Sequence, residues 1–446
     1  MKQLNVIYAG WGERWPLGTL ADAGRPGQPL LFEYSEEARR QGLELSPLRL
    51  PLEQPGAFAG EPCFLGLPGL IADALPDGWG MLLMDRAFAR GGRRPGQVSP
   101  LDRLAFIGER AMGALAFEPA DPLALDQEDI TLLQLAKEVD LVVGAAPAAA
   151  AEIALRHLLL LGGSPQGARP KVLVAFDPVS GKVGPPSSQA SPGGKRSSRL
   201  PPPSGSGIEG EGGETAAGAG SEPWLVKFPA REEHRDACAV EELYARLARA
   251  AGIDMPESRF FDLSAKHAAF GVRRFDRERG MRVPLLSLSA LLHVDHRLPA
   301  LDYEMLLRAT RRLSGDERQV HKAFERCVLN VLLHNRDDHS RNFAFRLGAD
   351  RRWRLAPVFD LTFNEGPGGE HQTAVAGEGR APSRAHLIEV ARRGGIDAGV
   401  AQKIIDRLLE AMGALPALAA ELPIRKTRLA ALRRTLGEDW RRVGAD

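Results

Sequence analysis

The sequence has few cysteines, almost no net charge and no long hydrophobic run. Its three cysteines, Cys63, Cys238 and Cys327, are odd in number and far apart, which argues against a disulfide framework or a zinc site. The formal net charge of +1 gives no reason to expect nucleic acid or an acidic membrane as a partner. Apolar runs fall short of a membrane span, and residues 1–5 lack the apolar core of a signal peptide. We therefore expect a soluble cytoplasmic protein whose cysteines stay reduced.

Composition also bounds the organisation of the chain. A length of 446 residues with 44% hydrophobic residues is enough for two or three domains with sizeable cores. Residues 178–222 are dominated by Gly, Pro and Ser and contain almost nothing to bury, so we predict a disordered insertion there.

One short stretch, residues 334–342, is unusually rich in side chains that carry chemistry. It reads His-Asn-Arg-Asp-Asp-His-Ser-Arg-Asn. An amphipathic run with helical spacing precedes it, and a strand-like run over 342–345 follows it. This pattern predicts a polar loop between a helix and a strand, where reactive groups are displayed on a rigid base.

The spacing within this loop favours phosphoryl transfer. Asp337 and Asn342 stand five positions apart, as do the catalytic Asp and the magnesium-binding Asn of a kinase catalytic loop. Residues 353–356 predict a second strand that forms a hairpin with the first. The hairpin would return Asp360 to the neighbourhood of Asp337, where it could act as a second magnesium ligand.

Two other interpretations of the loop remain open at this point. A metal-dependent phosphohydrolase would use four of its side chains as ligands, namely His334, Asp337, Asp338 and His339. Alternatively, the loop is a surface loop of solvated polar residues with no chemical role, although it has more acids, imidazoles and amides than solubility requires.

The first part of the chain predicts a small β-rich module. Residues 4–9 and 30–34 have strand patterns, and a Pro-Asp-Gly turn at 76–78 precedes a helix. The module closes near residue 120. Residues 127–160 have a helical pattern.

A glycine-rich loop leads into the next predicted strand, residues 172–176. The loop, residues 162–171, is not a Walker A motif, because no Gly-Lys-Ser/Thr opens a helix after it. Its backbone N–H groups could still approach phosphate oxygens, although an ordinary turn would have the same composition.

Lys227 lies among apolar residues in a predicted strand, residues 224–229. A lysine that reaches nucleotide phosphates would occupy such a position, and so would a lysine on the solvent face of an edge strand. The following helix, which we expect to end at Gly252, offers Glu241 or Glu242 as an ion-pair partner for Lys227. Residues 270–277 predict another strand. Beyond Asp360 we predict helices to the end of the chain, with a basic region at 425–442 that favours a solvated helical face.

Taken together, these motifs resemble the HipA-like serine/threonine kinases, the toxins of bacterial toxin–antitoxin pairs. The resemblance spans nearly the whole chain and rests on the order of these segments: Gly18-Thr19-Leu20, Phe32-Glu33-Tyr34, 75–79, 164–171, 274–277, 335–343 and 355–360. It implies a two-lobed, protein-kinase-like α+β fold with an N-terminal β-rich subdomain and an all-helical C-terminal lobe. The implied division is 1–120, 121–280 and 281–446, with the catalytic loop at 335–342 and the metal segment at 355–360.

The resemblance also implies roles for individual residues. Asp337 would be the general base, Asn342 and Asp360 would hold Mg²⁺, and Lys227 would contact the phosphates of ATP, paired with Glu241. The remaining nucleotide-binding positions would be Gln166, Gly167, Ala168, Arg169, Lys171, Arg273, Arg274, Phe275, His339 and Phe359. Ser164 matches the serine whose autophosphorylation switches the family's kinases off.

The same resemblance implies partners. Members of the family phosphorylate proteins, some of them translation components such as aminoacyl-tRNA synthetases. They also bind a small helix-turn-helix antitoxin, which in turn binds operator DNA. A catalytically inactive regulatory partner of such an antitoxin remains the alternative to an active kinase.

Overall fold

The computed structural model describes these residues: 2–22, 28–120, 130–143, 154–155, 157–159, 167–178, 181–184 and 221–445. Ser164 and Gln166 therefore lie outside the described residues, as does most of the 178–222 segment.

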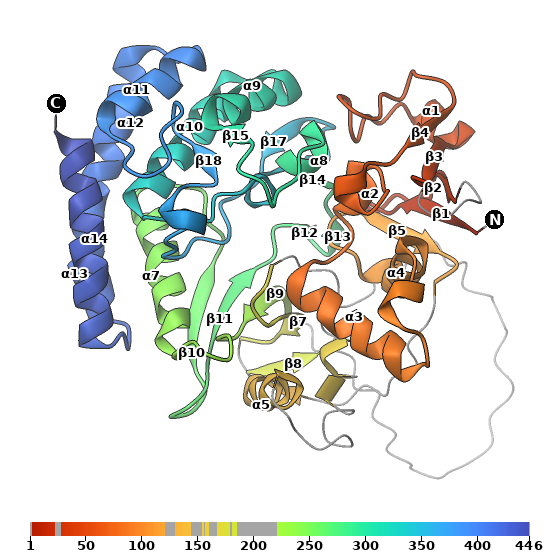
Figure 1. Ribbon diagram of the computed structural model, residues 1–446, viewed down its shortest axis with the longest axis horizontal. Coiled ribbons are helices and arrows are strands. Elements are labelled where there is room, and N and C mark those ends of the chain that lie inside the picture. Colours follow the sequence, from red (N-terminus) through yellow and green to blue (C-terminus); the bar gives the residue numbers. More distant parts are fainter. Residues whose placement is uncertain are drawn as a thin grey trace, which may run out of the picture.

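The chain begins with a five-stranded antiparallel sheet of order β4-β3-β2-β1-β5, drawn in red and orange in Figure 1. Its strands are β1 Gln3–Tyr8, β2 Trp15–Ala21, β3 Leu31–Tyr34, β4 Ala57–Ala59 and β5 Leu115–Glu118. Side chains of β3 alternate between exposed and buried, as expected for a sheet with one face on a core. The predicted strands at 4–9 and 30–34 are thus confirmed as β1 and β3.

Short helices occupy the stretch between β3 and β5. They are α1 Glu36–Gln41, α2 Gly69–Ala72, α3 Gly78–Arg90 and α4 Pro100–Ile107. The turn between α2 and α3 is the predicted Pro-Asp-Gly turn, and Gly78 has a positive φ of 37°. This conformation favours glycine and lets the chain reverse where it approaches the second sheet.

The second sheet has six strands in the order β10-β11-β9-β7-β8-β6. Their bounds are β6 Ile130–Thr131, β7 Lys171–Phe176, β8 Lys182–Gly184, β9 Glu222–Lys227, β10 Ser258–Asp262 and β11 Ala268–Arg273. Helix α5, Leu132–Val143, occupies part of the region predicted to be helical, and α7, Asp236–Ala250, packs against β10 and β11. Lys171 and Lys227 are directly opposite each other on β7 and β9, so both lysines project from the same region of the sheet.

Two predictions need correction in this sheet. The 178–222 segment is not wholly without structure, because β8 pairs with β7 through Val183 and Phe176, and β9 begins at Glu222. Val183 is buried. The composition of the long Gly/Pro/Ser stretch did not indicate this strand, because the strand has three residues and only one of them is apolar. The strand predicted over 270–277 ends at Arg273, because the next residues turn into a buried ion pair described below.

The C-terminal part is mainly helical. Its helices are α8 Leu288–Leu292, α9 Tyr303–Ser314, α10 Glu317–Leu332, α11 Arg384–Arg393, α12 Ala398–Ala411, α13 Leu415–Ala420 and α14 Lys426–Gly444. Helix α10 buries Val320, Phe324 and Val328, the face its sequence pattern predicts. Figure 1 shows α13 and α14 in blue along one edge of the molecule, far from the N-terminal sheet.

The lobe is nevertheless not all helical. A three-stranded sheet runs in the order β14-β16-β17, with β14 Leu285–Ser287, β16 Ala344–Leu347 and β17 Trp353–Leu355, so the predicted hairpin is confirmed. Residues 361–383 contain no α-helix, contrary to our prediction, and only Pro367–Gly369 form a 3-10 turn. Gly366, Gly368 and Gly369 all have positive φ there, and Thr373–Ala374 form β18 against β15, Leu301–Asp302.

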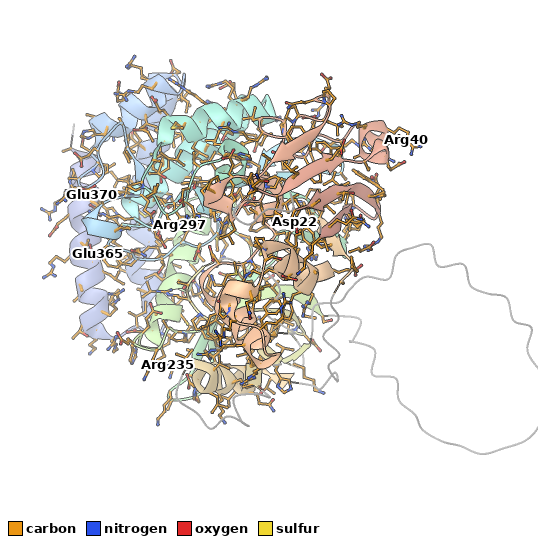
Figure 2. The ribbon with its side chains drawn as sticks, turned by 45° about the vertical axis from the view of Figure 1, so that its right-hand side comes forward. Asp22, Arg40, Arg235, Arg297, Glu365 and Glu370 are labelled. Atoms are coloured by element: carbon orange, nitrogen blue, oxygen red, sulfur yellow. The ribbon has the colours of Figure 1, made fainter. Side chains whose placement is uncertain are left out.

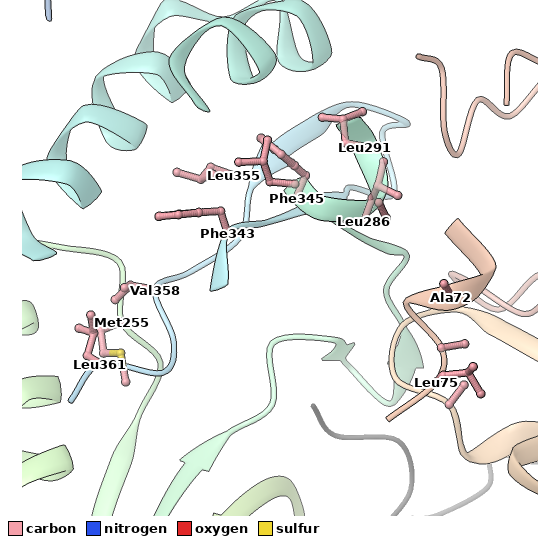
Figure 3. Packing of buried hydrophobic residues seen from close by; sticks show 14 of the residues in the cluster. Ala72, Leu75, Met255, Leu286, Leu291, Phe343, Phe345, Leu355, Val358 and Leu361 are labelled. Atoms are coloured by element: carbon pink, nitrogen blue, oxygen red, sulfur yellow. The ribbon is translucent and has the colours of Figure 1, made fainter. Parts of the chain in front are cut away.

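Apolar packing holds the segment before Asp360 in place. Figure 3 shows Phe345 and Leu355, paired across the hairpin, near Leu286 of β14. The same view shows Val358 and Leu361 beside Met255, and the Val358 N–H donates to the Asp254 carbonyl at 2.7 Å. The two flanks of Asp360 are thus fixed, one on the hairpin and one on the chain that follows α7.

Candidate active site

A cavity with about 1310 Å³ of empty space, including its open mouth, lies between the second sheet, the N-terminal module and the C-terminal lobe. It has a mainly apolar wall with a few polar groups, as small-molecule sites in proteins commonly do. Most sequence-predicted site residues line it: Gly167, Lys171, Lys227, Arg273, Arg274, Phe275, His339, Asn342, Phe359 and Asp360. Asp337, Ala168, Arg169 and Glu241 are described but are not part of its lining.

Lys227 is the centre of a buried ion-pair group. Its ammonium contacts the carboxylate of Asp360 and lies 3.1 Å from Oε2 of Glu241, and its side chain is 7% exposed. Burial alone would lower the pKa of Lys227, but Asp360 and Glu241 hold that pKa above its ordinary value. The lysine therefore stays charged and ties β9 to α7 and to the metal segment.

The choice between the two glutamates is settled by their neighbours. Glu242 turns away from the cavity and accepts hydrogen bonds from Arg246 Nε at 2.7 Å and from the Ser258 hydroxyl at 2.6 Å. Glu241 is the one that faces Lys227. Adjacent helix positions differ by about 100°, so only one of them can face the sheet.

Asp360 stands in a left-handed conformation with φ of 56°. Burial would raise the pKa of its carboxyl group, but Lys227 and Lys171 hold that pKa below its ordinary value. Lys171 is buried as well, and burial lowers its pKa. The side of the cavity near Asp360 therefore combines a carboxylate anion with cationic groups.

Arg169 does not point into the cavity. Its guanidinium contacts the carboxylate of Glu241 and lies 2.6 Å from that of Glu233. The nucleotide contact predicted for Arg169 stays a prediction, and its side chain forms an ion pair that also holds Glu241 in place. Arg169 pairs there because Glu241 on α7 and Glu233 in the segment before α7 bring two carboxylates to its guanidinium.

In the structure, Asp337 lies beside Asn342, the other residue of the predicted catalytic loop. The Asn342 amide donates to the carbonyl oxygen of Asp337 at 2.7 Å, and His339 Nε2 lies 3.9 Å from Asp337 Oδ1. The Asp337 side chain is 40% exposed. Partial burial raises the pKa of its carboxyl group, and the neighbouring His339 only partly offsets this.

The four side chains of the phosphohydrolase interpretation do not form one ligand set. His334 Nδ1 lies 2.7 Å from Asp439 Oδ2, on the side of α14. Asp338 is fully buried and accepts a hydrogen bond from Tyr303 at 2.7 Å. Within the described part of the chain, no three His, Cys, Asp or Glu side chains are arranged to hold a metal ion.

Arg336 and Asp338 anchor the segment that follows Asp360, a structural role that we predicted for neither residue. Arg336 donates to the carbonyl oxygens of Gly369 at 2.8 Å and Arg380 at 2.7 Å. Asp338 accepts from the backbone N–H of Gln372 at 2.8 Å. Residues 361–383 are thereby held against the catalytic loop.

The turn at 75–79 was predicted only as a turn, yet it joins two parts of the site. Asp77 accepts from the N–H of Gly167 and lies 3.1 Å from Arg341 of the catalytic loop. Trp79 donates from its indole to the Lys171 carbonyl at 3.1 Å. Asp77 is 90 residues from Gly167 in sequence. No local pattern signals such a contact.

Residues 273–275, whose backbone was predicted to meet the adenine, border the cavity, but two of their N–H groups already have acceptors in the protein. The N–H groups of Arg273 and Arg274 donate to the carbonyls of Glu257 and Pro223 at 2.8 and 2.9 Å. Of these three N–H groups, only the one of Phe275 has no acceptor among the residues described. The Phe275 ring lies 5.5 Å from that of Phe359, centroid to centroid.

Arg274 and Asp276 form a buried ion pair. Asp276 accepts from Arg274 Nε at 2.8 Å and Nη2 at 2.7 Å, and from the N–H of Gly113 at 3.0 Å. Arg277 lies 2.8 Å from the same carboxylate. The Asp276 carboxylate therefore joins the Arg274 side chain to Gly113 of the N-terminal module.

Comparison with known proteins agrees with this architecture. The family model of the HipA N-terminal domain matches residues 8–118. The family model of the HipA-like C-terminal domain matches residues 163–415. A search of curated protein sequences finds no match. No described helix has the length and apolar character needed to cross a bilayer.

Solved structures with a similar fold include the HipA of Shewanella oneidensis MR-1, in complex with HipB and operator DNA. It matches with a TM-score of 0.67 and 16% identity over 98% of this chain and 96% of that one. The Helicobacter pylori proinflammatory kinase CtkA matches with a TM-score of 0.36 and 14% identity over 50% of this chain and 88% of that one. One family model covers the N-terminal module, and the other alone covers more than half of the chain. The protein therefore belongs to the HipA-like family.

Proposed function

We propose that this protein is an ATP-dependent serine/threonine-protein kinase that transfers the γ-phosphoryl group of Mg-ATP to a protein hydroxyl. One observation carries the proposal: Lys227 bridges Glu241 and Asp360 in a cavity that Asn342 also lines. This is the arrangement of groups that positions phosphates and metal in protein kinases.

The residues present fit a magnesium ion. Asp360 offers an anionic carboxylate, and Asn342, whose amide nitrogen is already used on the Asp337 carbonyl, keeps its side-chain oxygen for a ligand. Mg²⁺ prefers such oxygen ligands and usually takes only one or two from the protein, the rest coming from phosphates and water. When bound there, the ion would neutralise charge on the transferring phosphoryl group.

Asp337 would orient the acceptor hydroxyl and accept its proton. A carboxylate with a raised pKa is a stronger base, as long as it remains ionised at the working pH. Lys227 would hold the nucleotide phosphates, and the apolar wall near Phe275 and Phe359 would take the adenine. His339, beside Asp337, would face the phosphates.

The proposed setting is a toxin–antitoxin pair. The Shewanella HipA in the matched structure is assembled with HipB and operator DNA, which supports a DNA-binding antitoxin as a partner of this protein too. The acceptor would be a protein, with a translation component such as an aminoacyl-tRNA synthetase as one candidate. Autophosphorylation of Ser164 would act as the off-switch, because a phosphate adds nearly two negative charges to the loop.

The proposal is tested by following label from ATP. With Mg²⁺, γ-labelled ATP is expected to label protein hydroxyls, whereas α-labelled ATP is not. Asp337→Asn should reduce the rate by at least about a hundredfold, within the range of general base catalysis. Because the Asp337 pKa is raised, kcat/KM should fall as the pH drops through a value above the ordinary Asp pKa of about 3.9. Equal labelling by wild type and Asp337→Asn, or none by either, would contradict the proposal.

A further inference from the structure

Gln372 donates a hydrogen bond from its side-chain amide to Oδ1 of Asp337 at 3.0 Å. It comes from the non-helical segment after Asp360, a stretch that no sequence motif marks. The bond occupies one carboxylate oxygen and leaves Oδ2 free of any hydrogen bond within the described part of the chain.

The backbone of Gln372 is fixed by buried groups. Its N–H donates to Asp338 Oδ1 at 2.8 Å and lies 3.3 Å from the Arg336 carbonyl. Its neighbours are attached to the same carboxylate, His371 Nδ1 at 2.8 Å and the Thr373 N–H at 3.2 Å. Thr373 also belongs to β18, which pairs with β15. Because the backbone is already fixed, only the rotamer freedom of the Gln372 side chain is lost when it forms this hydrogen bond.

Resting on the proposed kinase function, we propose that Gln372 is a positioning residue for Asp337. It holds one carboxylate oxygen so that the other faces the attacking hydroxyl. The glutamine itself touches neither the nucleotide nor the acceptor.

The charge on Asp337 responds to several groups. Burial, Asp360 and Asp338 disfavour its ionised form, whereas His339 and the Gln372 amide favour it. Loss of the amide therefore has two separable effects. The carboxylate becomes free to rotate, which lowers kcat, and its pKa rises further, which moves the acid limb of the pH profile upward.

Gln372→Met tests this, because methionine keeps the length of the side chain and removes the donor. Kcat is expected to fall about 10- to 100-fold, the effect of one hydrogen bond to a charged group, while KM for ATP stays close to that of wild type. The acid limb of kcat/KM should move up by about one pH unit. Gln372→Lys, which restores a donor and adds a positive charge, should move the limb the other way.

Gln402→Met serves as the matched control, since Gln402 is exposed on α12 and distant from the cavity. Thermal melting of each variant separates loss of folding from loss of positioning, and the opposite shifts of the two Gln372 variants cannot both come from misfolding. A purely structural role would lower the melting temperature and leave the kcat of the folded protein unchanged.

The outcomes distinguish this inference from the function on which it rests. Label transfer by the wild type with an unchanged kcat in Gln372→Met contradicts the role of Gln372 alone. Absence of transfer by the wild type contradicts the proposed function, and the positioning role falls with it. Transfer by the wild type with the expected loss of kcat and an unchanged KM for ATP in Gln372→Met supports both.

Discussion

Lys227→Met should lower the rate of phosphoryl transfer by about a thousandfold, the upper range for removal of a single electrostatic stabiliser in an active site. The substitution removes the cation that lies between Asp360 and Glu241 and leaves both carboxylates in a largely buried setting. The Asp360 pKa, now held down by Lys227 and Lys171, should rise, so this carboxylate would bind a metal less well. Arg169 on Glu241 and Lys171 near Asp360 should limit the loss of stability.

Initial rates of γ-label transfer at saturating Mg-ATP measure this effect. Lys403→Met is the control, because Lys403 is exposed on α12 and should leave the rate unchanged. Glu241→Gln should reproduce part of the loss, since it releases Lys227 without removing its charge. A Lys227→Met protein with a rate within tenfold of wild type would show that this lysine does not hold the phosphates.

Asp276→Asn should destabilise the folded protein by about 3–5 kcal/mol, the typical effect of removing one partner of a buried ion pair. The Asp276 side chain is 1% exposed and takes two hydrogen bonds from Arg274. Arg277 and Arg282 are also near it, and Arg282 donates to the Leu115 carbonyl at 2.7 Å. The substitution would leave these arginines without their common anion and loosen the N-terminal module from the hinge.

Chemical denaturation monitored by circular dichroism measures the change. Burial would raise the Asp276 pKa, but Arg274 and Arg277 hold it below its ordinary value. Its contribution is therefore fully present above the unfolded pKa of about 3.9 and is lost as the pH falls toward the folded value. The difference between variant and wild type should be constant from pH 5 to 8 and shrink only in acid.

An exposed ion pair provides the control for Asp276. Arg235, labelled at the surface in Figure 2, contacts Asp262, whose side chain is 60% exposed. Asp262→Asn should have little effect, because exposed pairs are screened by water and salt. Equal destabilisation by Asp262→Asn and Asp276→Asn would contradict the assignment of Asp276 as a buried anchor.

Local patterns in the sequence predicted the elements that carry the central site residues. Lys227 lies in an apolar strand, Glu241 on an amphipathic helix, and Asp360 after a hairpin. Each of these patterns is local and periodic, so it can be recognised without knowledge of the fold. The structure shows the predicted ion pair of Lys227 with Glu241, and it adds a contact of Lys227 with Asp360 that was not predicted.

Contacts between distant loops were not predictable in this way. Gln372 and Asp77 stand in irregular segments, where polar residues follow no period, and their partners are 35 and 90 residues away. The sequence 274–277 was interpreted as a nucleotide hinge, yet Arg274 and Asp276 are mostly engaged with each other. Such a pair has no signature that separates it from a charged strand end. The strand β8 and the non-helical segment 361–383 were missed for the same reason, since tertiary packing rather than local preference determines them.

The most direct measurement is intact-mass and peptide mass spectrometry of the purified protein after incubation with Mg-ATP, beside Asp337→Asn and a sample with chelator in place of Mg²⁺. We predict the addition of a phosphoryl group to the wild type, located on Ser164, and no addition in the variant or without the metal. A wild-type mass that stays unchanged, with no ATP consumed in the presence of candidate protein acceptors, would contradict the kinase account and favour an inactive partner of an antitoxin.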